Sequence, residues 1–230
     1  MLIGCDQGVL SPEERDALDA KIYEAQLMAL FLTGDLQPTE SYVTDLRQDL
    51  QRIRNNVSSA FPEVLNIDFM PPWFPGRVSL GFIGEYVDSI RDVSYSEWDS
   101  LNDSFSVYRI HSFLDFGESI YCDLFADSLL HPKRMAEQYY HLNGVDYASP
   151  SFWGGDRSNI YPLQYPSMRT YLVRFGDGDC ESGCYLNKYW YFRVRNSSVE
   201  FIGYWDATSN APSPNWWNEA EQNIENFHAH

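Results

Sequence analysis

The sequence has no long apolar run, few basic residues and no segment of low complexity. No stretch reaches the roughly 18 consecutive apolar residues that a membrane-spanning helix requires, so we expect membrane contact only through a lipid anchor. The chain carries 16 Lys and Arg against 33 Asp and Glu, which gives a formal net charge of -17. Because nucleic-acid binding depends on basic residues at the phosphates, we expect no nucleic-acid partner. A basic protein, by contrast, would be attracted to such a chain.

The sequence also lacks the common catalytic and zinc motifs. It contains no G-x-S-x-G, no H-E-x-x-H and no phosphate-binding loop. The sequence shows no zinc-ligand spacing of histidines, such as H-x3-H, next to a second pair of cysteines. We interpret His111, His131 and His141 as surface or capping residues. The many acidic residues leave open a carboxylate pair that is assembled only in space. We therefore expect no catalytic residues, with a carboxylate-based site as the alternative.

Two apolar stripes with helical spacing occupy residues 1–62. The first stripe ends at Gly34, and the second runs from Thr39 to Phe61. A short connection between two amphipathic helices predicts an antiparallel helical hairpin. The composition of the whole chain, 44% hydrophobic and 21% charged, is typical of a globular protein and agrees with such packing.

Residues 63–153 alternate between strand-like and helix-like segments. The strand-like runs span 77–83, 107–113, 119–125 and 145–152, and the helix-like runs lie near 94–105 and 131–142. The order strand, helix, strand, strand, helix, strand is the split βαβ pattern of a ferredoxin-like sandwich. We therefore predict a βαββαβ domain over 63–153.

Residues 154–230 predict an antiparallel β-meander followed by a tail. The stretch from 154 to 168 is rich in Gly, Pro and Tyr and has no periodicity, so we expect a connection there. Three strand-like runs follow at 170–175, 189–195 and 199–205, and the tail begins at Ala207. The predicted fold class is therefore α+β, with a helical hairpin, a ferredoxin-like sandwich and a C-terminal meander that carries a disulfide loop.

The four cysteines fall at positions 5, 122, 180 and 184. Cys180 and Cys184 lie in a Gly- and Asp-rich loop between two predicted strands, where a disulfide would fix the end of a hairpin. Because a disulfide requires an oxidising compartment, we expect an extracytoplasmic protein that is periplasmic, on the cell surface or secreted. Cys122 lies in a predicted strand and is interpreted as a small buried hydrophobe.

The first residues resemble part of a targeting signal. The sequence from Leu2 to Cys5, Leu-Ile-Gly-Cys, is similar to the end of a bacterial lipoprotein signal, in which the cysteine is lipidated after cleavage. The resemblance implies a lipid anchor on Cys5. The charged and apolar regions of a complete signal do not precede it in this sequence, so a chance match is the alternative.

Residues 75–152 resemble the propeptide and peptidase-inhibitor domain of subtilisin-like proteases. The segment from Pro75 to Val78 is similar to the opening strand of that domain, and the segment from Leu142 to Pro150 is similar to its closing Leu-Pro-Gly-Val-x-x-Ala-x-Pro sequence. Asn143 stands where the family has Pro. The resemblance implies a ferredoxin-like fold and a protein that binds a protease.

The same resemblance implies a contact segment. In that family the sheet lies against the enzyme, and the segment after the last strand passes through the active-site cleft. The corresponding segment here is 151–156, and we expect Phe152 and Trp153 to contact a protein partner. A propeptide is cut after this segment, whereas this chain continues to residue 230.

A second resemblance is carried by the sequence Gly178-Asp179-Cys180-Glu181-Ser182-Gly183-Cys184 and the aromatic strand after it. It is similar to the G-D-C-x-x-G-C segment of uncharacterised secreted bacterial proteins and lipoproteins. That resemblance supports an extracytoplasmic location and implies no activity.

Two groups of residues in this region have two interpretations each. Asp177, Asp179 and Glu181 alternate in the loop and could hold Ca²⁺, but the Gly and Glu of an EF-hand loop are absent, so a solvated loop is the alternative. Tyr189 and Tyr191 share one face of a predicted strand and are candidate binding residues for a carbohydrate or a protein. Packing of both strand faces in the core is the alternative.

These observations favour a non-enzymatic extracytoplasmic binding protein that engages a protease through residues 63–153. One alternative is a secreted hydrolase with a carboxylate-based site. Another is an immunity-type protein whose acidic surface neutralises a basic effector. A protein partner, either a protease or a basic protein, is expected under the first and third of these hypotheses, and Ca²⁺ is the one cofactor that the sequence indicates.

Overall fold

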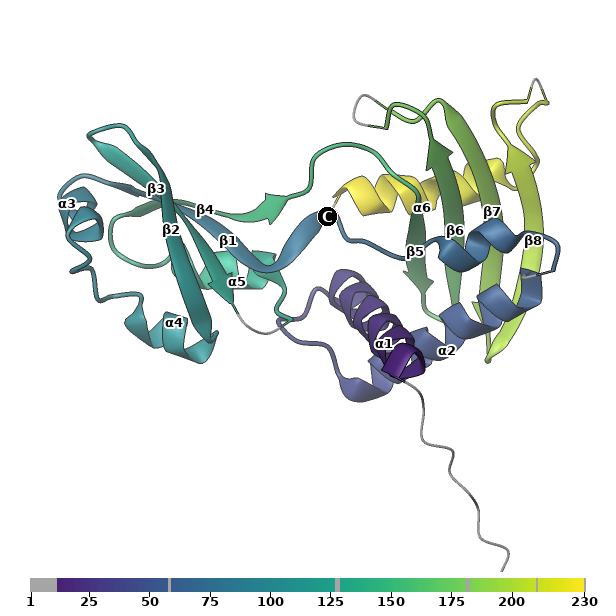
Figure 1. The fold of residues 1–230 in the computed structure, drawn as a ribbon, viewed down its shortest axis with the longest axis horizontal. Coiled ribbons are helices and arrows are strands. Elements are labelled where there is room, and N and C mark those ends of the chain that lie inside the picture. Colours follow the sequence, from purple (N-terminus) through teal and green to yellow (C-terminus); the bar gives the residue numbers. More distant parts are fainter. Residues whose placement is uncertain (1–11, 58, 127–128, 181–182, 210, 230) are drawn as a thin grey trace, which may run out of the picture.

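The computed structural model describes residues 12–229 apart from 58, 127–128, 181–182 and 210, with side chains from residue 21 onward. The chain is α+β, as predicted, and contains two four-stranded antiparallel sheets (Figure 1). Sheet A lies between residues 73 and 152, and sheet B lies between residues 159 and 206. Among the described helices, none is long and apolar enough to cross a membrane.

The N-terminal helical hairpin is confirmed. Its elements are α1 (Pro12–Thr33), α2 (Glu40–Val57) and the 3-10 helix η1 (Pro62–Asn66). Helix α1 ends at Thr33, and the next residue, Gly34, has a φ of +64° and donates its amide hydrogen bond to the carbonyl of Leu30 (2.9 Å). Leu46, Leu50 and Ile53 recur along α2 at helical spacing and are buried. The apolar stripe of the sequence is therefore the core face of this helix.

Sheet A has the predicted ferredoxin-like topology. Its elements are β1 (Trp73–Ile83), α3 (Tyr86–Arg91), α4 (Asp99–Ser104), β2 (Val107–Asp115), β3 (Ser119–Ala126), α5 (Pro132–Tyr139) and β4 (Val145–Phe152). The strand order is β2-β3-β1-β4, and all neighbouring strands are antiparallel. Strand, helices, strand, strand, helix and strand thus follow one another as the sequence pattern indicates.

Helices α3, α4 and α5 pack on one face of sheet A. Val78, Leu80 and Phe82 of β1 point to this face and are fully buried, together with Met135 and Tyr139 of α5. Contacts join α5 to β1 and β4, α3 to β1 and β3, and α4 to β2. These residues form a hydrophobic core of their own, separate from the core that contains sheet B.

Gly144 allows α3 to approach the start of β4. Its φ is +79°, and a Cβ at this position would lie 2.3 Å from the ring of Tyr86 in α3. Glycine tolerates both the backbone conformation and the close contact, whereas a larger residue would require α3 to move. The glycine of the Leu-Asn-Gly-Val sequence therefore has a packing role in this chain.

Sheet B contains one strand more than predicted. Its elements are β5 (Asn159–Tyr165), β6 (Met168–Asp177), β7 (Leu186–Arg195) and β8 (Ser198–Asp206), in the spatial order β5-β6-β7-β8. The expectation of a connection over 154–168 is wrong for β5. The first four residues of β5 are all buried, so no alternation of polar and apolar residues marks the strand. Pro162 is compatible with pairing because β5 lies at the edge of the sheet.

The expected C-terminal tail contains a helix, α6 (Trp217–Ala229). Its buried residues Ala220, Asn223 and Phe227 are three and four positions apart, as on a helical face. The side-chain amide of Asn223 donates to the carbonyl of Tyr161 in β5 (2.7 Å) and accepts from the hydroxyl of Thr170 in β6 (3.1 Å). A polar residue in the middle of the stripe concealed the helical pattern in the sequence.

Sheet B is covered on both faces, with α1 and α2 on one side and α6 on the other (Figure 1). On the first side, the hydroxyl of Tyr171 donates to Asp49 of α2 (2.9 Å). On the second side, the hydroxyl of Tyr191 donates to Glu219 of α6 (3.0 Å). The helical hairpin and sheet B thus share one core, which also contains Trp73 at the start of sheet A.

A buried ion pair joins the two helices of the hairpin. Arg54 of α2 makes two hydrogen bonds of 2.8 Å to the carboxylate of Glu24 in α1, and only 5% and 4% of the two side chains is exposed. Arg54 also donates to the carbonyl of Ile67, and the amide of Phe69 donates to Glu24. The pair therefore fixes both helices to the segment that leads into β1.

We expect Arg54→Met to lower the free energy of unfolding by about 3–5 kcal/mol, because Glu24 would stay buried without its partner. The control is Arg52→Met on the same helix, where the side chain is 35% exposed and the expected loss is below about 1 kcal/mol. Urea unfolding followed by tryptophan fluorescence measures both losses. Equal losses in the two variants would contradict the assignment.

Candidate functional site

The face of sheet A opposite its helices carries partly exposed side chains, and we call it the open face. Because side chains alternate along a strand, the neighbours of Val78 and Leu80 on β1 point to this side. The register pairs place residues of β2, β3 and β4 beside them. The residues that define the open face are Arg77, Ser79, Gly81, Arg109, Phe113, Tyr121, Asp123, Phe125 and Tyr147.

Aromatic rings occupy one end of the open face. Tyr121 lies directly over Gly81, where a Cβ would come within 2.7 Å of its ring. The ring centroids of Phe113 and Tyr147 lie 6.3 Å and 6.2 Å from that of Tyr121, and Phe113 and Tyr147 are 43% and 45% exposed. Exposed aromatic clusters of this kind are typical of protein interfaces.

A polar group occupies the other end of the open face. The carboxylate of Asp123 accepts hydrogen bonds from Arg77 (2.5 Å) and from the hydroxyl of Ser79 (2.5 Å), and Ser79 contacts the hydroxyl of Ser151 (3.0 Å). Arg77 also lies over the ring of Phe125 (4.8 Å). Asp123 is the one acid among the residues that define the open face, and Arg77 compensates its charge. The residues that define the open face therefore do not share the excess of negative charge that the whole chain carries.

The segment from Phe152 to Gly155 leaves sheet A next to this polar group, and we call it the exposed segment. The side chain of Phe152 is 54% exposed. Trp153 is held: its amide donates to the carbonyl of Pro72 (3.0 Å), its indole nitrogen donates to the carbonyl of Trp73 (3.2 Å), and its ring lies 3.6 Å from that of Phe74. Phe152 is therefore the side chain of this segment that a partner reaches most easily.

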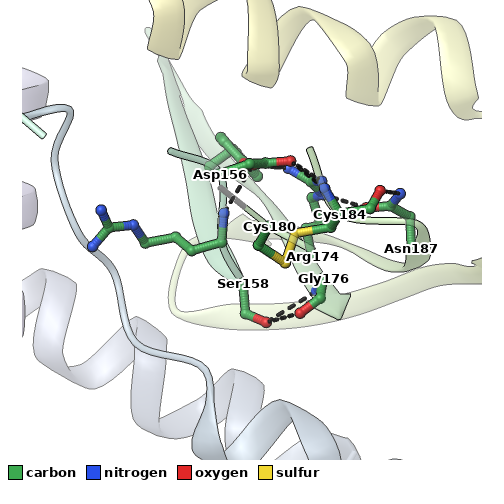
Figure 2. A network of polar contacts seen from close by, with 9 residues as sticks. Asp156, Ser158, Arg174, Gly176, Cys180, Cys184 and Asn187 are labelled. Atoms are coloured by element: carbon green, nitrogen blue, oxygen red, sulfur yellow. Dashed lines mark hydrogen bonds and ion pairs between the residues drawn. A yellow bond between two sulfur atoms is a disulfide. The ribbon is translucent and has the colours of Figure 1, made fainter. Parts of the chain in front are cut away.

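The far end of the exposed segment is held by Asp156. Figure 2 shows this residue between the disulfide loop and β6. Both carboxylate oxygens accept hydrogen bonds from Arg174 (2.5 Å each). The amide of Asp156 donates to the carbonyl of Cys180 (2.7 Å), and the amide of Cys184 donates to its carboxylate (3.4 Å). We call Asp156, Arg174, Cys180, Cys184 and Asn187 the clasp.

Asn187 completes the clasp from β7. Its side-chain oxygen accepts from Nε of Arg174 (2.7 Å), and its side-chain nitrogen donates to the carbonyl of Cys184 (3.0 Å). Next to it, the hydroxyl of Ser158 pairs with both the carbonyl and the amide of Gly176 (3.1 and 3.0 Å), as Figure 2 shows. The hydrogen bond to Asn187 orients the guanidinium group of Arg174, which favours its bidentate contact with Asp156.

The clasp sets the protonation of Asp156. Burial opposes ionisation and would raise the pKa of this carboxyl, but the hydrogen bonds and charge of Arg174, with the amides of Arg157 and Cys184, outweigh burial. The pKa of Asp156 therefore lies below its ordinary value of 3.8. The same pairing raises the pKa of Arg174 above its ordinary value: burial lowers it, but the hydrogen bonds that Arg174 donates to Asp156 outweigh burial.

Two other carboxyls also have a lowered pKa. The hydrogen bonds of Arg91 lower the pKa of Asp115 to about 2, and the hydroxyl of Thr208 lowers the pKa of Asp206. A carboxyl that acts as a general acid near neutral pH needs a raised pKa. These three aspartates therefore lack the raised pKa that the general acid of a carboxylate-based hydrolase requires.

The predicted disulfide is present, and the predicted aromatic site is not. Cys180 and Cys184 are bonded, and Cys122 is a buried free thiol in the core of sheet A.

Tyr191 is fully buried and Tyr189 is 9% exposed. Tyr189 packs on Trp205 of β8 and Trp217 of α6, and Tyr191 stacks on Trp216, which precedes α6. The interpretation of these tyrosines as a binding face is therefore wrong, because α6 covers them, and the alternative of core packing on both faces is confirmed.

The remaining predicted site residues are exposed or outside the described chain. Asp177 accepts a hydrogen bond from the amide of Gly178 (2.8 Å), and Asp177 and Asp179 are both exposed. Among the described residues, no group of three His, Cys, Asp or Glu is placed to hold a metal ion. Glu181 and Cys5 lie outside the described residues, so the calcium site and the lipid anchor stay predictions.

Sequence reasoning found the exposed segment and missed the clasp. Phe152 and Trp153 were reached through the resemblance of residues 75–152. Asp156 ends the expected contact segment 151–156 and Arg174 lies in a predicted strand, but no local pattern links these two residues. The disulfide loop was the one signal nearby. Comparisons of the chain with family models, with curated proteins and with solved structures gave no match.

We expect Asp156→Asn to loosen the exposed segment at neutral pH, since a neutral amide loses the charge-assisted contacts with Arg174. Amide hydrogen exchange at residues 153–157 should become faster, and the stability should fall by about 1–2 kcal/mol. Asp177→Asn, which changes an exposed carboxylate of the neighbouring loop, is the matched control and should leave this exchange unchanged.

The pH dependence of the clasp follows from the lowered pKa of Asp156. Its contribution is present above the unfolded-state pKa near 3.8 and is lost as the pH falls through the lower folded-state pKa. The wild-type segment should therefore stay protected down to about pH 4 and lose protection below it, whereas Asp156→Asn should show no such step. A step of equal size in the variant would assign it to another group.

Proposed function

We propose that this chain is a non-enzymatic binding protein that engages a subtilisin-like protease through the exposed segment and the open face of sheet A. The observation that carries the proposal is that Phe152 is exposed at the end of β4 and is followed by a segment that is held on both sides of its exposed Gly154 and Gly155. Trp153 fixes one end to the start of β1, and Asp156 fixes the other end to sheet B. A peptide held in one conformation binds a cleft with a smaller loss of conformational entropy.

The position of the segment supports this mode of binding. Strand β4 forms an edge of sheet A, so an extended chain that continues from it can form backbone hydrogen bonds with a partner strand. Phe152 then supplies a bulky aromatic side chain for a specificity pocket. The side chain of Phe152 lies on the α5 side of sheet A, where it lines a pocket with Pro150 and Tyr140. The open face, on the other side of the sheet, presents arginines and aromatic rings, the residue types that interface cores favour.

This arrangement differs from a propeptide in one respect. The chain after Asp156 continues directly into β5 and sheet B, so the segment is a bridge between two folded parts (Figure 1). A protease that cleaved within the segment would leave both new ends held by their own anchors. We therefore propose an inhibitor that stays bound after cleavage, unlike a propeptide, which is cut and released.

We also propose an extracytoplasmic location. The support is the disulfide between Cys180 and Cys184, since such bonds persist in oxidising compartments. A protease partner of the subtilisin class would be met in the same compartments if it is secreted.

The test is a titration of the protein against a subtilisin-family protease, with residual activity and intact mass followed together. We expect saturable inhibition while the chain stays intact. Phe152→Ala should weaken the inhibition at least tenfold, because a central aromatic anchor is removed. Tyr23→Ala, which removes a 46% exposed aromatic side chain on α1, is the matched control and should inhibit like the wild type. Absence of inhibition, or digestion of the folded chain, would overturn the proposal.

A further inference from the structure

The two cysteines of the disulfide hold Asp156 with their own backbone groups. The carbonyl of Cys180 accepts from the amide of Asp156, and the amide of Cys184 donates to its carboxylate. These two groups can act together only while the loop keeps them on the same side of Asp156. The disulfide, which brings the two Cα atoms to 4.1 Å, imposes that arrangement.

Asn187 holds one end of this loop through the carbonyl of Cys184 (3.0 Å). Gly178 and Gly183 have φ values of +99° and +113°, so both sit in a backbone region that glycine enters and leaves freely. Among the described backbone contacts of the loop, Cys180 donates to the carbonyl of Gly178 (2.9 Å), and Tyr185 donates to the carbonyl of Asp177 (3.0 Å) at its base. Without the covalent link, the loop would therefore gain conformational freedom beyond this closing pair.

Sheet B does not need the disulfide in the same way. The pairing of β6 with β7 is continuous from Arg169 and Val194 to Asp177 and Leu186, and the loop only caps its end. The core residues of these strands, such as Leu172, are fully buried between helices on both sides. Opening the disulfide should therefore release the loop and leave the sheet folded.

The disulfide is also within reach of a reductant. Cys180 and Cys184 are both partly exposed. Cys122 is fully buried in the separate core of sheet A, so it does not compete as a thiol partner. Disulfides that are exposed at a loop are the kind that thiol exchange reaches.

We infer that the Cys180–Cys184 disulfide is a redox switch for the exposed segment: reduction by a dithiol removes the two contacts of the loop with Asp156, leaves this residue held by Arg174, and makes the segment easier for a protease to cut. A thiolate of the dithiol attacks one cysteine sulfur and forms a mixed disulfide, and the second thiol of the reagent then displaces that sulfur. The reagent ends as a disulfide, and both cysteines end as thiols, with two electrons and two protons transferred. The effect on a protease rests on the proposed function, but the loss of these two contacts does not.

The first experiment measures amide hydrogen exchange with and without dithiothreitol as the dithiol. Exchange at residues 153–158 and 183–186 should become at least tenfold faster on reduction, while the amides of β1 and β3 and the middle of β6 stay protected. The variant with Cys180→Ser and Cys184→Ser should behave like the reduced protein without any reagent. Cys122→Ser should respond to the reagent like the wild type.

Two results would overturn the inference. Unchanged exchange at 153–158 after reduction would show that the other contacts of Asp156 suffice. Loss of protection throughout β6 and β7 would show that the disulfide holds the whole sheet.

A second experiment separates this inference from the proposed function. The oxidised and reduced proteins are incubated with a subtilisin-family protease, and the cleavage site is read by mass spectrometry. Faster cutting within 152–156 on reduction supports the switch even where the oxidised protein does not inhibit, in which case the proposed function alone fails. Equal cutting in both states overturns the switch.

Discussion

The bidentate contact between Asp156 and Arg174 determines how the two sheets of this chain are connected. The residues between the end of β4 and the start of β5 have no secondary structure of their own, and their exposed part would adopt many conformations without an anchor on the sheet B side. Arg174 supplies that anchor from the middle of β6, which is paired with β5 on one side and with β7 on the other. The position of Gly154 and Gly155, between the anchors at Trp153 and Asp156, thus depends on an ion pair that lies at the other sheet.

The two sheets have different roles because they are covered differently. Sheet B is enclosed by α1 and α2 on one face and α6 on the other, which buries the aromatic residues of its middle strands, Tyr171, Trp190 and Tyr191. Sheet A is covered on one face, and its other face keeps rings and arginines exposed in a chain with a net charge of -17. An acidic surface keeps the protein soluble and repels acidic proteins, whereas the open face can meet a partner without that repulsion. We interpret sheet B as the scaffold and sheet A as the part that presents the contact.

The parts of the fold that the sequence predicted are those with a clear period. The stripe of Leu46, Leu50 and Ile53 and the alternation along β1 each reflect one buried face, so hairpin and sandwich could both be predicted. Strand β5 is buried on both faces and α6 has an asparagine in its core face, so neither shows a simple pattern. Alternation placed Tyr189 and Tyr191 correctly on one face, but it could not indicate that α6 covers that face. The clasp depends on tertiary contacts between distant segments, which no local pattern contains.

The place of the disulfide argues for a local purpose. Cys180 and Cys184 are four positions apart, and closing so short a loop constrains the unfolded chain by about 2 kcal/mol, well below the roughly 5 kcal/mol expected for a loop of a hundred residues. An interaction that stabilises the whole fold joins distant segments, as the ion pair of Glu24 and Arg54 joins α1 to α2. This bond instead fixes two backbone groups that contact Asp156, and through Asp156 it fixes the exposed segment. Its main effect is therefore on the conformation of the segment and not on the stability of the domain.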